Sequence, residues 1–278
     1  RMTQIAHEIK ASYAFVERNF NLVKRYWGWE VVWIIYSIVN ALAITFIGRA
    51  SGEITGRALS EAEIDKAILF LLVGTLVWSY LSVIFHDISE AIAWERWEGT
   101  IEYTFMAPVT RFTHMMGQTV FSVLYGAAKT AVILLAVSLF FRLDLSRANF
   151  GGSLLVLLAG SLSFIGLGIV AAVLPLLFPE RGAQMTHVLQ ALVLLVSGVY
   201  YPITVLPEWL QPVAQVSPAT YVLEGMRAGI LQGASTGSML RYVWPLLHLG
   251  VIFIPLGVYV FQVAERYAKR AGKLKRSG

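Results

Sequence analysis

Few residues of this sequence are of the types and spacing that could support catalysis, and none stands in a complete motif. Ser197-Gly198, with His248 on a late apolar run, could serve an intramembrane serine protease, but Leu195 stands where the first glycine of G-x-S-G belongs. The pair Gly272-Lys273 lacks the upstream glycine of a phosphate-binding loop. The sequence has no cysteine, which excludes disulfides and thiolate chemistry. We therefore predict no catalytic residue, no metal site and no cofactor in this chain, and intramembrane proteolysis stays a remote alternative.

A row of glutamates is the most regular charged feature. Glu95, Glu98 and Glu102 recur at helical spacing, and an adjacent face is apolar, formed by Trp94, Trp97, Ile101 and Phe105. A short helix with one apolar and one acidic face, held at a membrane surface, is suited to docking in a groove of a soluble partner. A solvated amphipathic loop is the alternative.

A second unusual stretch is residues 199–233, called here the proline-rich segment. Its prolines, at spacings of five, five and six residues, are Pro202, Pro207, Pro212 and Pro218. Each removes a backbone donor, so no straight membrane helix tolerates this density. Pro207 can begin a short helix that ends at Val216. Ser217 can cap a second helix with Pro218 at its first position, and Gly233 would stop it. We predict short broken helices that dip into a bilayer, with an amphipathic surface loop as the alternative.

Polar residues inside apolar runs are the third candidate set. Lys129 lies in the middle of such a run, where a lysine costs about 2.5–3.5 kcal/mol on insertion scales, so it should face a partner or an aqueous cavity. It could meet an anionic group of a substrate, or face a subunit interface, carbonyls or water. Asn40 is the other possible pathway residue. We expect isolated polar residues such as His187 and His248 to form helix–helix hydrogen bonds, and we expect no acidic residue in mid-span.

The elements that position these residues follow from composition. Of the 278 residues, 57% are hydrophobic and only 14% charged, and the mean hydropathy is +0.65. A soluble domain is about a quarter charged. We predict an all-α polytopic membrane protein with an amphipathic interfacial helix at 1–27, a transmembrane domain at 28–266 and a basic tail at 267–278. The six predicted spans are residues 31–48, 67–85, 119–141, 151–178, 185–201 and 242–261.

Orientation follows from the distribution of lysine and arginine. Of the 22 such residues, 14 fall in the termini and in the connections at 86–112 and 179–184, and 7 fall on the opposite side, Lys129 being the remaining one. Because cytoplasmic loops carry the excess of positive charge, both termini should be cytoplasmic and the proline-rich segment should be outside.

Two stretches resemble motifs of ABC-2-type exporter permeases. Residues 98–102, Glu-Gly-Thr-Ile-Glu, followed by Ala107-Pro108-Val109, are similar to that family's cytoplasmic segment between the second and third spans. Residues 197–202, 206–210 and 217–221 are similar to its motif between the fifth and sixth spans. The number and order of the apolar runs agree, so the resemblance covers nearly the whole chain.

The resemblance implies a role for each motif. The first would be a coupling helix that contacts a nucleotide-binding subunit, with the residues Glu95, Glu98, Gly99, Thr100, Ile101, Glu102 and Pro108. The second would form re-entrant helices at the extracellular mouth, with the residues Tyr200, Tyr201, Pro202, Pro207, Trp209, Pro218 and Tyr221. Family members work as two permeases, here expected to be a homodimer, with two ATPase subunits that bind ATP and magnesium.

We therefore expect the permease subunit of an ATP-driven exporter in the cell membrane, with no nucleic-acid partner. Apolar spans and short outer loops favour an amphipathic or hydrophobic substrate such as a drug or lipid, and a polysaccharide or teichoic-acid exporter is the alternative. A channel or secondary carrier would need intramembrane acids or ion-binding carbonyls, and the predicted spans contain no acid.

Overall fold

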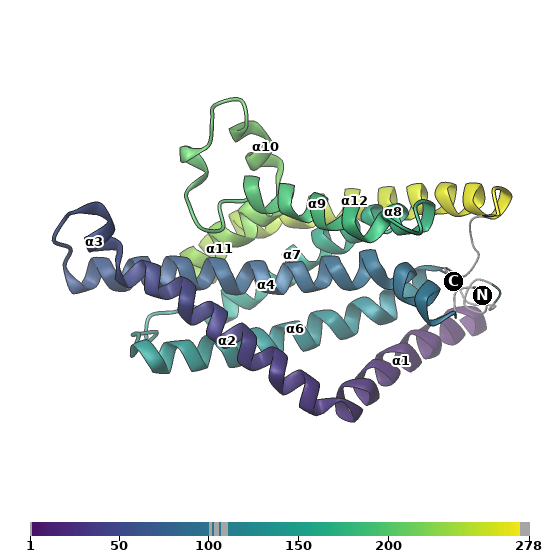
Figure 1. The fold of residues 1–278 in the computed structure, drawn as a ribbon, viewed down its shortest axis with the longest axis horizontal. Helices are drawn as coiled ribbons and strands as arrows, with labels where there is room; N and C mark the ends of the chain where they lie inside the picture. The colour runs from purple at the N-terminus through teal and green to yellow at the C-terminus, as the bar shows by residue number, and fades with distance from the viewer. Residues whose placement is uncertain (1, 100–101, 103–105, 107–110, 273–278) are drawn as a thin grey trace.

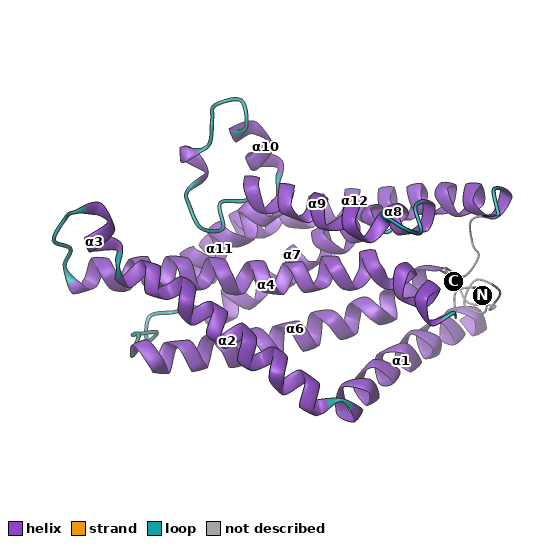
Figure 2. Ribbon diagram, viewed as in Figure 1, coloured by secondary structure: helices purple, strands orange, loops and turns teal. Residues whose placement is uncertain are grey.

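The computed structural model describes residues 2–99, 102, 106 and 111–272, and every regular element in those ranges is a helix (Figures 1 and 2). The all-α prediction is confirmed. Long helices run along the length of the molecule, and short ones occupy the connections. The helices in chain order are α1 (Met2–Arg25), α2 (Trp27–Arg49), α3 (Ser51–Thr55), α4 (Glu61–Glu98), α6 (Arg111–Phe141), α7 (Phe150–Ala171), α8 (Val173–Leu177), α9 (Gly182–Val196), the 3-10 helix η1 (Ile203–Val205), α10 (Gln211–Val216), α11 (Pro218–Leu231) and α12 (Thr236–Arg270).

Five helical stretches of the described residues are long and apolar enough to cross a membrane. They are Trp27–Arg49, Glu61–Ala93, Gly117–Phe141, Phe150–Leu177 and Thr236–Arg270. The predicted span at 185–201 is not among them. Its helix, α9, has 15 residues and ends at Val196. The chain then turns at Gly198, whose φ of 68° lies in the left-handed region that glycine adopts without strain.

The second predicted span is longer at both ends than the sequence indicated. A capping box starts α4 at Glu61: the Ser60 side chain accepts a hydrogen bond from the Glu63 backbone N–H, and the Glu63 side chain accepts one from the Ser60 backbone N–H. Without a glycine or proline to interrupt the C-terminal half, α4 continues to Glu98, and Gly99 ends it with a φ of 73°. The predicted polar connection at 86–112 is therefore helical over its first part, and its ionisable residues share the helix with the apolar run.

Helices α4 and α7 form the centre of the bundle. Side chains of α4 are buried along most of its length, including Tyr80, whose hydroxyl lies 2.7 Å from Ser161 Oγ of α7. Small residues of α7 allow close contact with its neighbours. A Cβ added at Gly166 would lie 2.5 Å from Phe253 Cβ of α12, and one at Gly160 would lie 2.2 Å from Val222 Cγ2 of α11.

Helix α12 packs along α7 and is continuous from Thr236 to Arg270. Pro245 and Pro255 lie inside it, so the helix accommodates both prolines without ending at either. It extends well beyond the predicted span at 242–261. The predicted span at 151–178 consists of two helices, α7 and α8, which meet at Ala172.

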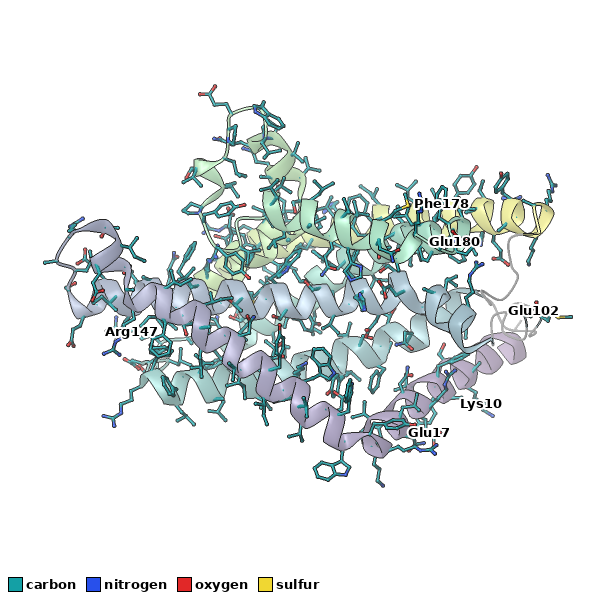
Figure 3. All side chains as sticks on the ribbon, in the orientation of Figure 1. Lys10, Glu17, Glu102, Arg147, Phe178 and Glu180 are labelled. Atoms are coloured by element: carbon teal, nitrogen blue, oxygen red, sulfur yellow. The ribbon has the colours of Figure 1, made fainter. Side chains whose placement is uncertain are left out.

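Helix α1 packs against α6. The Asn19 amide donates a 2.7 Å hydrogen bond to Gln118, and a Cβ added at Gly117 would lie 2.6 Å from Phe15 Cβ. The start of α1 and the end of α12 lie at the same end of the molecule. Figure 3 places Glu102 and Glu180 toward that end and Arg147 at the opposite one. The connections that the sequence assigns to one side therefore share one end of the fold.

Candidate functional site

The end of α4 leads into the predicted coupling segment. Glu98 is the last residue of α4, Gly99 forms its left-handed cap, and Glu102 is exposed. Thr100, Ile101 and Pro108 lie outside the described residues, so their predicted role stays a prediction.

The burial of Glu95 differs from what the predicted acidic row requires. Only 7% of this residue is exposed, so it does not lie on the open surface where a partner would dock. The reason is that α4 continues through this region and packs against α8, where the guanidinium of neighbouring Arg96 donates a 3.2 Å hydrogen bond to the Leu176 carbonyl. Burial lowers the pKa of Arg96. An exposed acidic surface, if it forms, must be built from residues beyond Glu95.

The proline-rich segment projects from the side of the bundle (Figure 1) and contains η1 and α10 before α11 begins. Pro218 is at the start of α11, as predicted. Ser217 occupies the N-cap position, but its hydroxyl does not cap the helix and lies 3.1 Å from Ser197 Oγ instead. The helix predicted from Pro207 begins later, at Gln211. Pro207 lies in the turn before it, where its carbonyl accepts a hydrogen bond from the Leu210 N–H.

Arg227 of α11 ties the beginning of this stretch to the bundle. Its guanidinium donates to the carbonyls of Gly198 and Val199 at 2.9 and 2.6 Å, and lies 3.5 Å from the centre of the Phe70 ring of α4. A Cβ added at Gly74 would lie 2.1 Å from the Val199 oxygen, so only glycine admits the chain there. We call these contacts the Arg227 tie. The sequence analysis did not predict the Arg227 tie, although an arginine within an apolar helix indicates a buried partner.

A cavity of about 290 Å³ lies beside the Arg227 tie. Its polar lining includes Thr220, Glu224 and Tyr201, and Pro202 also borders it. Burial lowers the pKa of Arg227 to about 10, and Glu224 partly opposes this shift. Burial also raises the pKa of Glu224, opposed by Arg227 and Arg241.

The other predicted gate residues occupy different environments. Pro218 is buried, Tyr221 is partly buried, and Pro207 is exposed. Tyr200 is 38% exposed, and Trp209 is 75% exposed. The structure thus brings Tyr201 and Pro202 to the cavity and leaves Pro207 and Trp209 on the surface.

Lys129 lies among acidic groups that the sequence did not place in spans. Its ammonium interacts electrostatically with Glu30 of α2 and Asp87 of α4. The carboxylates are held in turn by α6, through hydrogen bonds from Ser122 to Asp87 and from Tyr125 to Glu30. Both acids lie outside the spans that the sequence predicted and within longer helical stretches of the structure, because α4 continues as a helix past residue 85 and α2 begins at Trp27, ahead of Glu30. They lie toward the ends of these stretches, so the expectation of no acid in mid-span is not contradicted.

Asn40, the other predicted pathway residue, is exposed on α2 and is not part of the Lys129 group. An apolar groove of about 410 Å³ lies elsewhere, between α6, α7 and α12. Its lining is almost entirely aliphatic, and the residues include Val120, Leu124, Leu158, Leu162, Val243 and Leu247.

Comparison with known proteins gives two findings. Residues 11–231 match the family model described as ABC-2 type transporter. The chain is also 24% identical, over 215 residues, to the inner membrane transport permease YadH of Escherichia coli K12 and of Shigella flexneri. Each match covers 75% of this chain and 82% of the relative.

Proposed function

Since the chain belongs to the ABC-2 type transporter family, we propose that it is the transmembrane permease subunit of an ATP-driven exporter. The family match from 11 to 231 carries this proposal, because it includes both the predicted coupling segment and the proline-rich segment. A separate nucleotide-binding subunit supplies ATP hydrolysis and holds ATP and magnesium. The related YadH proteins bear the name of transport permeases, which supports the same assignment.

The substrate is amphipathic or hydrophobic, such as a drug or a lipid. The aliphatic groove between α6, α7 and α12 supports this, because it offers apolar side chains and almost no hydrogen-bonding group to a ligand. A polysaccharide would need many polar contacts along its path. A groove of about 410 Å³ is of the size that accommodates a small apolar molecule or part of an acyl chain.

The working assembly contains two copies of this chain and two ATPase subunits. Exposed apolar side chains on the projecting proline-rich segment support a second copy, since Val205, Trp209, Val213 and Val216 are each more than half exposed. Mass measurement of the complex purified with its ATPase checks the stoichiometry, and a monomer that transports alone would contradict it.

In the proposed topology, both termini and the 86–112 connection are cytoplasmic, and the proline-rich segment is extracellular. Helix α9 with the start of that segment makes the sixth crossing, and α1 lies at the cytoplasmic interface. The chain has no cysteine, so single cysteines at Glu102 and Glu208 can be labelled without background. An impermeant reagent applied to intact cells should reach only the Glu208 site.

The end of α4 and the residues that follow it couple ATP hydrolysis to the spans. Glu98, Gly99 and Glu102 lie directly after the buried turn that contains Glu95 and Arg96, so a force on them acts on a helix packed in the centre of the bundle. Exposed charges with no partner would contribute only about 0–1 kcal/mol, and reversing them would then change little.

The test is ATP-dependent export by the chain reconstituted with its ATPase subunit. The coupling variant carries Glu98→Lys and Glu102→Lys. The control carries Glu53→Lys and Glu208→Lys, which make the same charge change at residues proposed to lie outside. We expect the first pair to reduce substrate-stimulated ATPase activity and export, and the second to leave both near the parent values.

Two results would count against the proposal. Export by the chain without any ATPase subunit would remove the assignment as an ABC permease. Equal assembly, hydrolysis and export by the two charge-reversed pairs would remove the coupling role of Glu98 and Glu102 while leaving the permease assignment in place.

A further inference from the structure

Three ionisable side chains converge between α4 and α9, away from the sites described above. His86 and Glu90 lie one turn apart on α4, and His187 lies on α9. Glu90 Oε2 is 3.4 Å from His86 Nε2, and Glu90 Oε1 is 3.4 Å from His187 Nδ1. The two imidazole rings are 5.5 Å apart between their centres. One ligand atom from each residue lies within 4.8 Å of the others.

The backbone fixes this arrangement. Residues four apart on a helix project from the same face, which puts His86 directly beside Glu90. Helix α9 packs on α4 and brings His187 to the other oxygen of the same carboxylate. The hydroxyl of buried Thr186 also lies 3.4 Å from Glu90 Oε1. Glu90 is nearly buried, whereas the histidine side chains are 40% and 60% exposed, so the carboxylate is fixed and the rings remain accessible.

The spacing of these atoms fits ligands of a metal ion. Two ligands at about 2.0–2.1 Å from a tetrahedral zinc ion are about 3.3–3.4 Å apart. Each histidine nitrogen lies at this distance from one oxygen of Glu90, His86 from Oε2 and His187 from Oε1, so a small rotation of the carboxylate would present one oxygen to both. Both distances are longer than a charge-assisted hydrogen bond of about 2.7–2.9 Å. Two imidazoles and one carboxylate are a known zinc ligand set, with a fourth position left for water.

We propose that His86, Glu90 and His187 bind a divalent transition-metal ion, with zinc as the best fit. This departs from the sequence prediction of no metal site, which regarded His187 as isolated and could not foresee its contact with α4. A nearly buried carboxylate also needs a compensating charge, and a divalent ion at this place provides one.

His187 has a second contact within α9. Its Nδ1 lies 2.7 Å from the Ala183 carbonyl, one turn back on the helix. A ring that donates Nδ1–H to a carbonyl has its lone pair on Nε2. Binding a metal through Nδ1, the nitrogen that lies near Glu90, therefore requires the ring to release Ala183 and lose the Nδ1 proton.

A bound ion would join α9 to α4. The chain directly after α9 meets α4 again at the Arg227 tie, where Val199 lies against Gly74. Zinc would thus hold one end of α9 to α4, while the Arg227 tie holds the chain beyond its other end. The predicted consequence is a metal-dependent restraint on the helix that leads into the proline-rich segment.

The test is zinc binding by the full chain, purified with a tag that contains no histidine and stripped with a chelator. Zinc titrated by calorimetry should bind at one equivalent per chain. His86→Gln, Glu90→Gln and His187→Gln should each weaken binding by at least about tenfold, because loss of even an outer partner of a ligand has that effect. His248→Gln is the matched control, since His248 Nδ1 makes the same 2.7 Å contact with a carbonyl one turn back and has no carboxylate beside it among the described ion pairs.

A second measurement keeps the test decisive if one variant folds poorly. Cobalt bound to the parent protein should give the visible absorption of a four-coordinate nitrogen and oxygen site, and His86→Gln should abolish it. Absence of zinc binding at micromolar free metal would overturn the proposal and leave the cluster as a polar contact between α4 and α9. Unchanged zinc binding in the variant that lacks all three ligands would overturn it equally.

Discussion

Helices α4 and α7 differ from α2, α6 and α12 in burial, although all of them are apolar enough to cross a membrane. The most apolar windows of the first two helices are 61% and 67% buried, whereas those of the other three are 17%, 22% and 22% buried. Hydropathy is only slightly higher in the two buried spans, because lipid and protein interior are similarly apolar environments. Small side chains allow neighbouring helices to approach a helix closely and so contribute to its burial.

Helix α7 shows the effect most clearly. Gly160 faces α11, and Gly152 and Gly166 face α12, at distances that no larger side chain could occupy, so these neighbours approach the backbone. Peripheral α2 begins with large aromatic residues instead, and Trp27 and Trp29 are both more than 60% exposed. The comparison predicts that equal substitutions have unequal effects on the two groups of helices.

The largest expected difference is between two glycines. Gly166→Ala places a methyl group within 2.5–2.8 Å of Phe253 and Ile254, including backbone atoms, and should destabilise the protein by about 3 kcal/mol. Gly28→Ala meets no atom within 4 Å and should stabilise α2 by about 0.5–1 kcal/mol. Thermal unfolding in detergent measures both, and equal shifts would refute the division into central and peripheral helices.

Two arginines provide the next comparison. Arg227→Ala removes the hydrogen bonds to the Gly198 and Val199 carbonyls. Because these carbonyls would then lack a partner, we expect the free energy of unfolding to fall by about 2 kcal/mol. Arg241→Ala removes an exposed contact with Tyr242 and should cost less than about 0.5 kcal/mol. Hydrogen exchange of residues 199–217 should accelerate only in the first variant. Protection that survives Arg227→Ala would show that the tie does not hold this segment.

Two tyrosines test the same division with a smaller effect. Tyr80→Phe removes the hydrogen bond between Tyr80 of α4 and Ser161, and we expect the free energy of unfolding to fall by about 1 kcal/mol. The loss is limited because the Ser161 hydroxyl still donates to the Leu157 carbonyl at 2.8 Å. Tyr259→Phe, on a side chain that is 63% exposed, should change the unfolding temperature little. A reversed order of the two shifts would contradict the central position of α4.

The smallest expected effect is a pH dependence at Glu224. Burial raises its pKa in the folded state, so the folded chain binds this proton more tightly than the unfolded chain does. The resulting stability is fully present below the unfolded pKa and is lost as pH rises through the raised value. The unfolding temperature of the parent relative to Glu224→Gln should therefore increase from neutral toward mildly acidic pH. A difference that stays constant with pH would exclude a raised pKa.

The sequence was sufficient for the helical class and for the position of the apolar runs, because periodicity and hydropathy are local properties. Pro218 at the start of α11 was likewise predictable, since proline sets its own backbone angle. The length of α4 was missed because ionisable residues such as Asp87 were taken to mark its end. The partners of Arg227, Lys129 and His187 depend on contacts between distant helices, and no spacing in one helix indicates them.

In the proposed topology, where α9 makes the sixth crossing, this short helix is a site of hydrophobic mismatch. Its 15 residues rise about 22 Å, against a hydrocarbon core about 30 Å thick. Helices longer than the core adjust to bilayers of different thickness by tilting, whereas a helix shorter than the core has no length to spare. The acyl-chain length of the surrounding lipid therefore acts first on the junction between α9 and the proline-rich segment. Lipids with longer acyl chains would strain the contacts of the Arg227 tie before they disturb the packing of α7 on α12.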